Sequence, residues 1–249
     1  MVSPFARALE LLAAFTPNDR ALGTQKLAAR TGLPPSTVTR IAQSLVALGY
    51  LRYANSERKY RLAAPVLALG FGAIVNSTVQ HAARSCMTRF AEQYRVHVNL
   101  SSRDQLALVI RESCNSPHAP LAPDLHVGLR LGLASSPIGW ALLAAVSEQE
   151  REYLLDRAER RCLRGWPRLR RRSIEAIAQV RQMGVCSSLG DWAQDLAIVA
   201  APVVIEGAAP LVIACVGARG QVGRLRVERE LGPRLVALAE AIRAGEVVQ

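Results

Sequence analysis

One stretch of the chain, residues 35–48, carries polar side chains on what would be a single helix face. Its apolar residues recur every three or four positions, which predicts an amphipathic helix. They are Val38, Ile41, Leu45 and Leu48. The opposite face would present Ser36, Thr37, Thr39, Arg40 and Gln43. Arginine pairs with guanine and glutamine with adenine in the major groove, and short hydroxyls reach phosphates or thymine methyls, so this face is suited to double-stranded DNA.

The segments beside this helix predict the motif that positions it. Upstream, apolar periodicity predicts helices over residues 4–15 and 25–31, and Gly32-Leu33-Pro34 forces a tight turn. Downstream, residues 51–53 and 59–62 flank a basic tip and predict a β-hairpin. Arg58 and Lys59 would then lie near the DNA backbone or minor groove. Helix, turn, helix and hairpin together predict a winged helix-turn-helix domain.

The distribution of charge supports this assignment. The formal net charge of the 249-residue chain is +11. Residues 1–65 hold nine Lys or Arg and three Asp or Glu, so more than half of the surplus lies in the first quarter. A concentrated positive charge favours a polyanionic partner, with nucleic acid ahead of an anionic membrane surface.

The rest of the chain has the pattern of a mixed domain. Runs of β-formers over residues 96–101, 106–112, 125–131, 196–205 and 211–216 alternate with five helical segments. The helical segments cover 78–94, 138–145, 148–158, 173–183 and 227–245. Adjacent hairpins with helices packed on them predict an α+β fold with an antiparallel sheet. We expect a DNA-binding domain over 1–62, a linker helix over 63–80 and a second domain over 81–249.

Several classes of protein are excluded by the same sequence. The five cysteines are scattered, odd in number and without a CxxC pair, which argues against a disulfide framework or zinc site and indicates a reducing, cytoplasmic setting. The N-terminus lacks the apolar run of a signal peptide, and the longest uncharged stretch, 62–83, contains Pro65, Gly70 and Gly72. No phosphate-binding glycine loop or catalytic constellation occurs. We therefore predict no enzyme activity, no metal or other cofactor, and no membrane partner.

The N-terminal motifs resemble those of IclR-type bacterial transcription regulators. The matching features are Arg7-Ala8-Leu9, the recognition helix from Leu33 to Ile41, and Gly49-Tyr50-Leu51 at its end. The likeness extends through residues 132–146, 180–185 and 197–204, the last with its Ala-Ala-Pro-Val. It implies a GAF-like C-terminal domain that binds a small-molecule effector and modulates operator binding. It also implies a homodimer, which reading a paired DNA site requires in practice, or a dimer of dimers.

The resemblance also implies where the effector binds. In relatives that take small carboxylates, a Ser-Gly-Ala-Gly loop, an Asp, a Cys and two Ser form the pocket. The corresponding residues of this chain are Ser136, Ile138, Gly139, Ser188, Ile198, Cys215 and Gly217. Pro137 has no N–H to donate, and neither Ile198 nor Gly217 brings a polar side chain. We expect a pocket suited to a larger, more apolar or aromatic organic acid.

Two alternatives stay open. The C-terminal domain could be an assembly module only, in which case no metabolite would change DNA affinity, or it could hold an enzyme's cleft. The seven arginines of residues 160–172 could form a second polyanion contact or a subunit interface, but we favour a solvated surface. The sequence leaves open the effector, the operator and its target genes, and whether the protein represses or activates.

Overall fold

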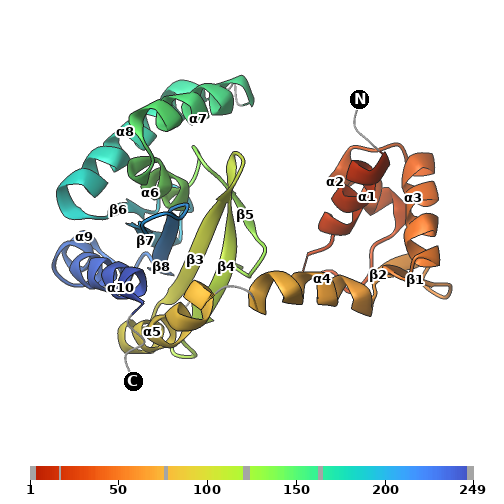
Figure 1. Cartoon of the computed structure of the whole chain (residues 1–249), viewed down its shortest axis with the longest axis horizontal. Coiled ribbons are helices and arrows are strands. Elements are labelled where there is room, and N and C mark those ends of the chain that lie inside the picture. Colours follow the sequence, from red (N-terminus) through yellow and green to blue (C-terminus); the bar gives the residue numbers. More distant parts are fainter. Residues whose placement is uncertain (1–3, 17, 76–77, 120–123, 162–164, 246–249) are drawn as a thin grey trace. The chain divides into compact units, whose positions relative to one another are not determined.

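The computed structural model describes residues 4–16, 18–75, 78–119, 124–161 and 165–245. Internal contacts divide the chain into two compact units, with the division after residue 76. The first unit holds three helices, a hairpin and a further helix (Figure 1). They are α1 (Pro4–Ala13), α2 (Thr24–Thr31), α3 (Pro35–Ala47), β1 (Leu51–Ala54), β2 (Lys59–Leu62) and α4 (Ala64–Val75).

A small apolar core holds the first three helices to the hairpin. Leu11, Leu27 and Val38 are fully buried and come from α1, α2 and α3 in turn. Leu22 exchanges two backbone hydrogen bonds with Tyr60 of β2, at 2.9 and 2.8 Å, and so forms an isolated β-bridge beside the hairpin. Between α2 and α3 the chain reverses at Gly32, whose φ of +69° is the left-handed conformation that glycine adopts most readily. The predicted helix-turn-helix and wing are therefore present.

The second unit is built on one six-stranded antiparallel sheet with strand order β5-β4-β3-β8-β7-β6. The strands are β3 (His97–Asp104), β4 (Ala107–Asn115), β5 (Arg130–Gly132), β6 (Cys186–Leu189), β7 (Leu196–Val203) and β8 (Leu211–Ala218). The helices are α5 (Thr78–Tyr94), α6 (Pro137–Ala145), α7 (Glu148–Arg161), α8 (Trp166–Met183), α9 (Arg224–Arg226) and α10 (Gly232–Ala244). A π-helical turn, Val227–Leu231, joins α9 to α10.

Helices cover both faces of this sheet, which is why nearly all of its central strands are buried. Figure 1 shows α5 and α10 on one side and α6 with α8 on the other. Because side chains alternate along a strand, each strand contributes to both cores. We name the two sides the α5 face, which includes Val98, Val199 and Cys215, and the α6 face, which includes Ile198, Ala214 and Val216.

The structure corrects two predicted elements of this unit. The strand expected over residues 125–131 is reduced to β5, which pairs only through residues 130–132. The last helix is not continuous from residue 227, because its first turn is π-helical before α10 begins at Gly232. Within the described part of the chain, no helix combines the length and the apolar character that a bilayer crossing requires.

Candidate functional site

Helix α3 presents the predicted polar residues away from the core of its unit. Ser36, Arg40 and Gln43 are exposed, and Thr37 and Thr39 are partly exposed. The apolar residues of the same helix, Val38, Ile41 and Leu45, are buried. Pro35 occupies the first turn, where its missing N–H costs nothing and its fixed φ favours helix initiation. The sequence pattern therefore produces one buried and one solvent-facing side.

Hydrogen bonds within α3 limit what each polar residue can offer. Thr39 donates its hydroxyl proton to the Pro35 carbonyl at 3.0 Å, so only its oxygen lone pair and methyl group remain available. The Arg40 side chain has no ion-pair or hydrogen-bond partner among the described residues, and α3 contains no acidic residue. A guanidinium that is free and unneutralised keeps all five of its donors for another molecule.

The hairpin places its basic residues at the tip. Arg58 and Lys59 are both exposed, and Arg58 adopts a left-handed φ of +52° in the turn. The one acidic residue of this tip, Glu57, is paired with Arg61. Tyr53 and Tyr60 pack with their ring centroids 4.9 Å apart and stiffen the hairpin behind the tip. The positive charges of Arg58 and Lys59 therefore lie at the tip of a hairpin that aromatic packing stiffens.

Most of the residues predicted for the effector site lie on the α6 face. Ile198 of β7 aligns with Ser188 of β6, and both side chains are buried on that face. Helix α6 packs over β6, β7 and β8, so its first residues lie over the same surface. Cys186 donates a hydrogen bond to the Pro137 carbonyl at 3.4 Å, which fixes the start of α6 above β6. The structure thus brings Ser136, Ile138, Gly139, Ser188 and Ile198 to one side of the sheet.

Cys215 and Gly217 are not brought to this group. Both lie on the α5 face, where Cys215 packs in the core beneath α5 and α10. A Cβ at Gly217 would lie 2.8 Å from Val222, also on that side. The β8 residues that do face α6 are Val212, Ala214 and Val216. Cys215 and Gly217 therefore lie on the face opposite to that of Ile198, because neighbouring residues of a strand point to opposite faces.

Ser136 and Gly139 each stabilise the local structure at the start of α6. Ser136 occupies the N-cap position, where its hydroxyl donates to Gly132 O at 2.8 Å and accepts from Gly139 N at 3.1 Å. Gly139 lies so close to the segment before the helix that a Cβ would be 2.0 Å from the Leu133 oxygen. Trp140 N donates to Ser136 O at 3.0 Å, so the Ile138 N–H is the first-turn amide left without a partner among the described residues.

Sequence reasoning missed two polar residues on the same face. Asn99 and Ser101 of β3 are both 0% exposed, and their side chains point toward α6 because they align with Ala214 and Val212. The signal was present as an alternation of polar and apolar residues over 97–101. Such alternation is typical of a half-solvated strand, so the polar positions were not expected inside the domain.

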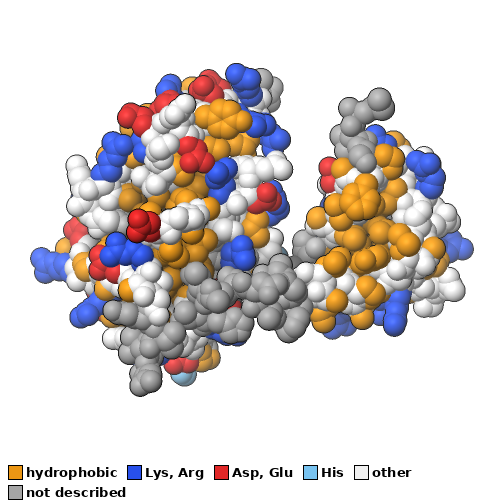
Figure 2. Space-filling view, viewed as in Figure 1, with side chains coloured by type: hydrophobic (Ala, Val, Ile, Leu, Met, Phe, Trp, Pro, Cys, Tyr) orange, Lys and Arg blue, Asp and Glu red, His pale blue; other side chains and the backbone are white. Residues whose placement is uncertain are grey.

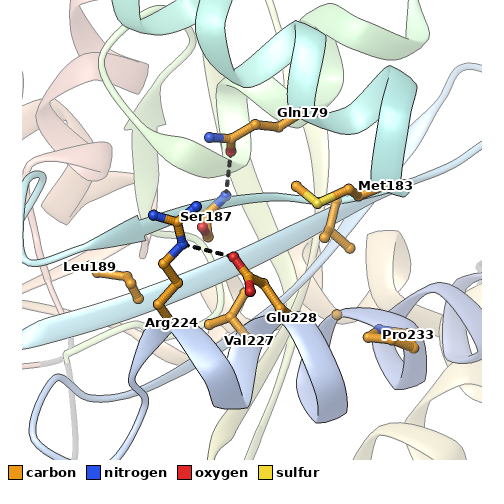
Figure 3. A pocket seen from close by; sticks show the side chains of 10 residues that line it. Gln179, Met183, Ser187, Leu189, Arg224, Val227, Glu228 and Pro233 are labelled. Carbon is orange, nitrogen blue, oxygen red and sulfur yellow. Dashed lines mark hydrogen bonds and ion pairs between the residues drawn. The ribbon is translucent and has the colours of Figure 1, made fainter.

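The pocket in Figure 3, of about 470 Å³, lies away from this group. It borders the outer side of β6 between α8 and the start of α10, with Met183, Leu189 and Val227 among its walls. Its polar groups are already engaged: Arg224 pairs with Glu228 at 2.7 Å, and Gln179 accepts from the Ser187 amide at 3.2 Å. None of the predicted effector residues lines it.

Three of the described cysteines, Cys114, Cys186 and Cys215, lack the properties of nucleophiles. Burial raises the pKa of Cys186 and of Cys215 to about 12, so both remain neutral thiols at physiological pH. Burial also raises the pKa of Cys114. Within the described ranges, no three His, Cys, Asp or Glu residues are arranged to hold a metal ion. Cys162 lies outside the described residues.

The arginine-rich run over 160–172 is partly neutralised. Three ion pairs involve it: Arg170 with Glu152 at 4.0 Å, Arg171 with Glu175 at 3.8 Å, and Arg172 with Asp191 at 3.1 Å. Arg160 and Arg161 are exposed at the end of α7, and residues 162–164 fall outside the described residues. The pairs reduce the net positive charge that this surface presents.

Comparison with known proteins matches both units. Residues 5–54 match the IclR helix-turn-helix domain, and residues 71–244 match the C-terminal domain of the bacterial transcriptional regulator IclR. The HTH-type transcriptional regulator TsaQ1/TsaQ2 of Comamonas testosteroni is 29% identical over 246 residues, which cover 98% of this chain and 88% of the relative.

Solved structures agree in fold. The crystal structure of an IclR family transcriptional regulator from Brucella abortus is 33% identical, covers 99% of this chain and 93% of its own, and superposes with a TM-score of 0.82. An IclR homologue from Microbacterium hydrocarbonoxydans, solved with 4-hydroxybenzoate, shares the fold. It is 21% identical, the match covers 98% of this chain and 100% of the homologue, and the TM-score is 0.72. Two domain matches that together span most of the sequence and a close structural relative lead to one conclusion: this chain belongs to the IclR family of transcriptional regulators, with a DNA-binding helix-turn-helix and a C-terminal effector domain.

Proposed function

We propose that α3 reads the operator through Ser36, Thr37, Thr39, Arg40 and Gln43, while Arg58 and Lys59 of the hairpin hold the DNA backbone. The observation that carries the proposal is the unneutralised Arg40 on an exposed helix face without acidic residues. Among the five, Arg40 and Gln43 have the reach for base edges, and the short hydroxyls of Ser36 and Thr37 suit phosphates.

We further propose that the C-terminal domain binds a small organic acid on the α6 face. Three observations support an acid of some size with apolar or aromatic character. The Ile138 amide is free at the positive end of α6, where an anion is stabilised. The surrounding side chains on the strands, Ile198, Ala200 and Val216, are apolar. A relative of the same fold was solved with 4-hydroxybenzoate.

The functional unit that we propose is a homodimer, or a dimer of such dimers. Large apolar side chains remain exposed on the first unit: Phe5 of α1 is 74% exposed and Leu67 of α4 is 76% exposed. Figure 2 shows hydrophobic side chains gathered on the displayed face of this unit. Patches of this kind mark interaction sites, and a second copy would supply the paired helix that a two-fold operator requires. Leu67→Asp should then shift the protein toward monomer in analytical ultracentrifugation, whereas Leu225→Asp, also at an exposed leucine, should not.

A ligand changes DNA binding only if it prefers one arrangement of the protein over another. We propose that the acid does so by acting on α6, and that the protein works in the cytoplasm by binding rather than by catalysis. The test is thermal unfolding of the full chain against a panel of aliphatic and aromatic acids. A ligand at 100 times its Kd stabilises by about 2.7 kcal/mol, which raises the Tm by about 5–10 °C for a domain of this size.

A positive result would then be carried to a footprinting assay on the promoter regions beside the gene, with and without the acid. If no acid raises the Tm and none changes the footprint, the C-terminal domain serves assembly alone. If an acid is consumed during the assay, the domain is an enzyme and the proposal fails.

A further inference from the structure

Two polar side chains are buried in the centre of the sheet without bonding partners. Asn99 and Ser101 are each 0% exposed. Neither amide atom of Asn99 nor the hydroxyl of Ser101 has a hydrogen-bond partner in the part of the chain that the structure describes. A buried polar group without a partner costs stability that an apolar residue of the same shape would not cost. Such groups are rare in folded proteins, and each one requires a reason.

The neighbouring strands show why these side chains find no partner within the protein. Asn99 lies between Ala214 of β8 and Ser113 of β4. Ala214 has no polar side chain, and the Ser113 hydroxyl already donates to the Leu125 carbonyl at 2.9 Å. Ser101 lies between Val212 and Ile110, which are both apolar.

Two other polar side chains on this face are satisfied, whereas Nε1 of Trp166, in the same core, also has no partner among the described residues. Nδ1 of His97, two residues before Asn99, is 2.6 Å from Oδ1 of Asn115. Ser188, on the far edge of the same face, accepts from Trp192 N at 3.1 Å. Of the four buried, unpaired side-chain atoms in the described residues, three therefore lie at two successive inward positions of one central strand.

The chemistry of these atoms defines what they would bind. An amide offers both donors and an acceptor, and a hydroxyl offers one of each. The residues aligned with them across β8 and β7 are Ala214, Ala200, Val212 and Pro202, none of which is charged. A neutral hydroxyl or carbonyl group matches such a setting, because a buried carboxylate would need charged donors or several amides.

The start of α6 and Asn99 lie over different strands of the sheet. Cys186, which bonds to Pro137 O, belongs to the same cross-strand row as Ala200, Ala214 and Asn99. Three strand spacings, or about 14 Å, separate the backbones of Cys186 and Asn99. A ligand that contacts both the start of α6 and Asn99 must therefore be elongated and carry a polar group at each end.

From these observations we infer that Asn99 and Ser101 are the neutral polar contacts of the effector site, and that the effector is an aromatic carboxylic acid with a hydroxyl or carbonyl group opposite its carboxylate. The inference rests on the proposed function, since it gives polar contacts and a ligand class to the same face. The carboxylate meets the Ile138 amide and the far group meets Asn99. The described pockets do not reach Asn99, so binding displaces the cover that α6 and its preceding segment form. Ligand binding is thereby coupled to the position of α6.

The experiment compares two acids of equal size on the full-length protein by isothermal titration calorimetry. The probes are 4-hydroxybenzoate and 4-methylbenzoate, which differ only in the polar group. The variants are Asn99→Leu, which keeps the shape of the side chain, and the smaller change Ser101→Ala. Ser113→Ala is the matched control, because its hydroxyl faces the same side but is already bonded to the protein.

We expect the wild type to bind 4-hydroxybenzoate about tenfold or more tightly than 4-methylbenzoate, the effect of one hydrogen bond. Asn99→Leu should remove this preference without lowering the Tm of the unliganded protein, and Ser101→Ala should reduce it several-fold. Ser113→Ala should lower the Tm and keep the preference.

Each other outcome has a defined meaning. Equal binding of both acids by the wild type overturns the inference and leaves the proposed acid sensor intact. A fall in Tm for Asn99→Leu with an unchanged preference shows that Asn99 is a structural residue, which also overturns it. Binding of neither acid overturns the ligand class, and a blank across the wider acid panel overturns the proposed function as well.

Discussion

Asp19 and Arg30 form a two-pronged ion pair that ties the turn after α1 to the end of α2. Nη2 of Arg30 lies 3.1 Å from Oδ1 of Asp19, and Nη1 contacts the other carboxylate oxygen and also donates to Ala14 O at 2.8 Å. Thr16 adds a backbone and a hydroxyl bond to the same carboxylate. Hydrogen bonds from Arg30 first, and then from Thr16, hold the pKa of Asp19 far below its usual range.

Replacing this carboxylate should loosen the first unit. We expect Asp19→Asn to lower the Tm of the winged-helix unit by roughly 2–5 °C at neutral pH, the range for a single ion pair in a small unit. A depressed pKa contributes stability above the unfolded-state value, near 4, and this is lost as the pH falls toward the folded-state pKa. The difference in stability between the wild type and Asp19→Asn should therefore become smaller below about pH 4. The rates of amide hydrogen exchange in peptides covering residues 14–31 measure this difference.

The control for this prediction is Lys26, which lies 3.5 Å from the same carboxylate but is largely exposed. Lys26→Gln should leave the exchange rates within error. Faster exchange in Lys26→Gln than in Asp19→Asn would contradict a specific role for Arg30.

Base reading by α3 can be tested at Arg40. Arg40→Ala should cost about 1–3 kcal/mol of discrimination between the operator and a variant changed at one base pair. The reason is that the free guanidinium provides two parallel bonds to one base. Fluorescence anisotropy on matched DNA duplexes measures the difference. Ser44→Ala is the control, because that hydroxyl is bonded to Arg40 O at 3.1 Å and should not select bases. Equal loss of affinity for every sequence in Arg40→Ala would reduce Arg40 to a phosphate contact.

The wing is expected to act on the DNA backbone. The logarithm of the DNA-binding constant falls linearly with the logarithm of the salt concentration, and each phosphate contact that is lost makes this negative slope less steep by about one. Arg58→Ala and Lys59→Ala should each show this change and leave sequence preference intact. Arg171→Ala, in the arginine-rich run of the other unit, should leave the slope unchanged. A flatter slope in Arg171→Ala would instead make that run a second DNA contact.

Helix α6 depends on one buried arginine. Arg151 is 8% exposed and donates from Nε to Leu143 O at 2.7 Å and from Nη2 to Val146 O at 3.0 Å. Arg151→Met would leave both carbonyls without a donor, at a cost of about 2–3 kcal/mol, since bonds from a charged donor are the stronger kind. Urea unfolding measures this. Arg157→Met, at an exposed arginine whose hydrogen bond and ring contact are both with Tyr153, should change stability by less than about 0.5 kcal/mol.

The secondary structure was largely predictable because local patterns determine it. Apolar spacing predicted α5 with the bounds that the structure has, and the start of α3 followed from Pro35, a residue type that is favoured in the first turn of a helix. The shortened β5 shows the limit of this reasoning. Residues 125–129 have β-forming side chains, but Ile110 bonds to Leu129 O and Gly128 bonds back to Ile110 O, which closes a turn there instead of a longer strand.

The candidate site was less predictable, because it depends on which face of a strand each residue takes and on which elements pack over that face. The resemblance assigned Cys215 to the same pocket as Ile198, but the length of the β7–β8 connection decides which face each β8 residue takes. Asn99 and Ser101 were missed because alternation shows which residues share a face and says nothing of what covers it. In this fold α6 and the segment before it cover that face, and two polar residues become interior.

Strand β6 is at an edge of its sheet, and open edges of this kind tend to recruit strands from other molecules. On that edge, the backbone N–H of Ser187 already donates a hydrogen bond to the side-chain oxygen of Gln179 from α8. We expect this single hydrogen bond to hinder the pairing of a further strand with β6, so Gln179→Ala should lower the solubility of the protein before it alters any binding property.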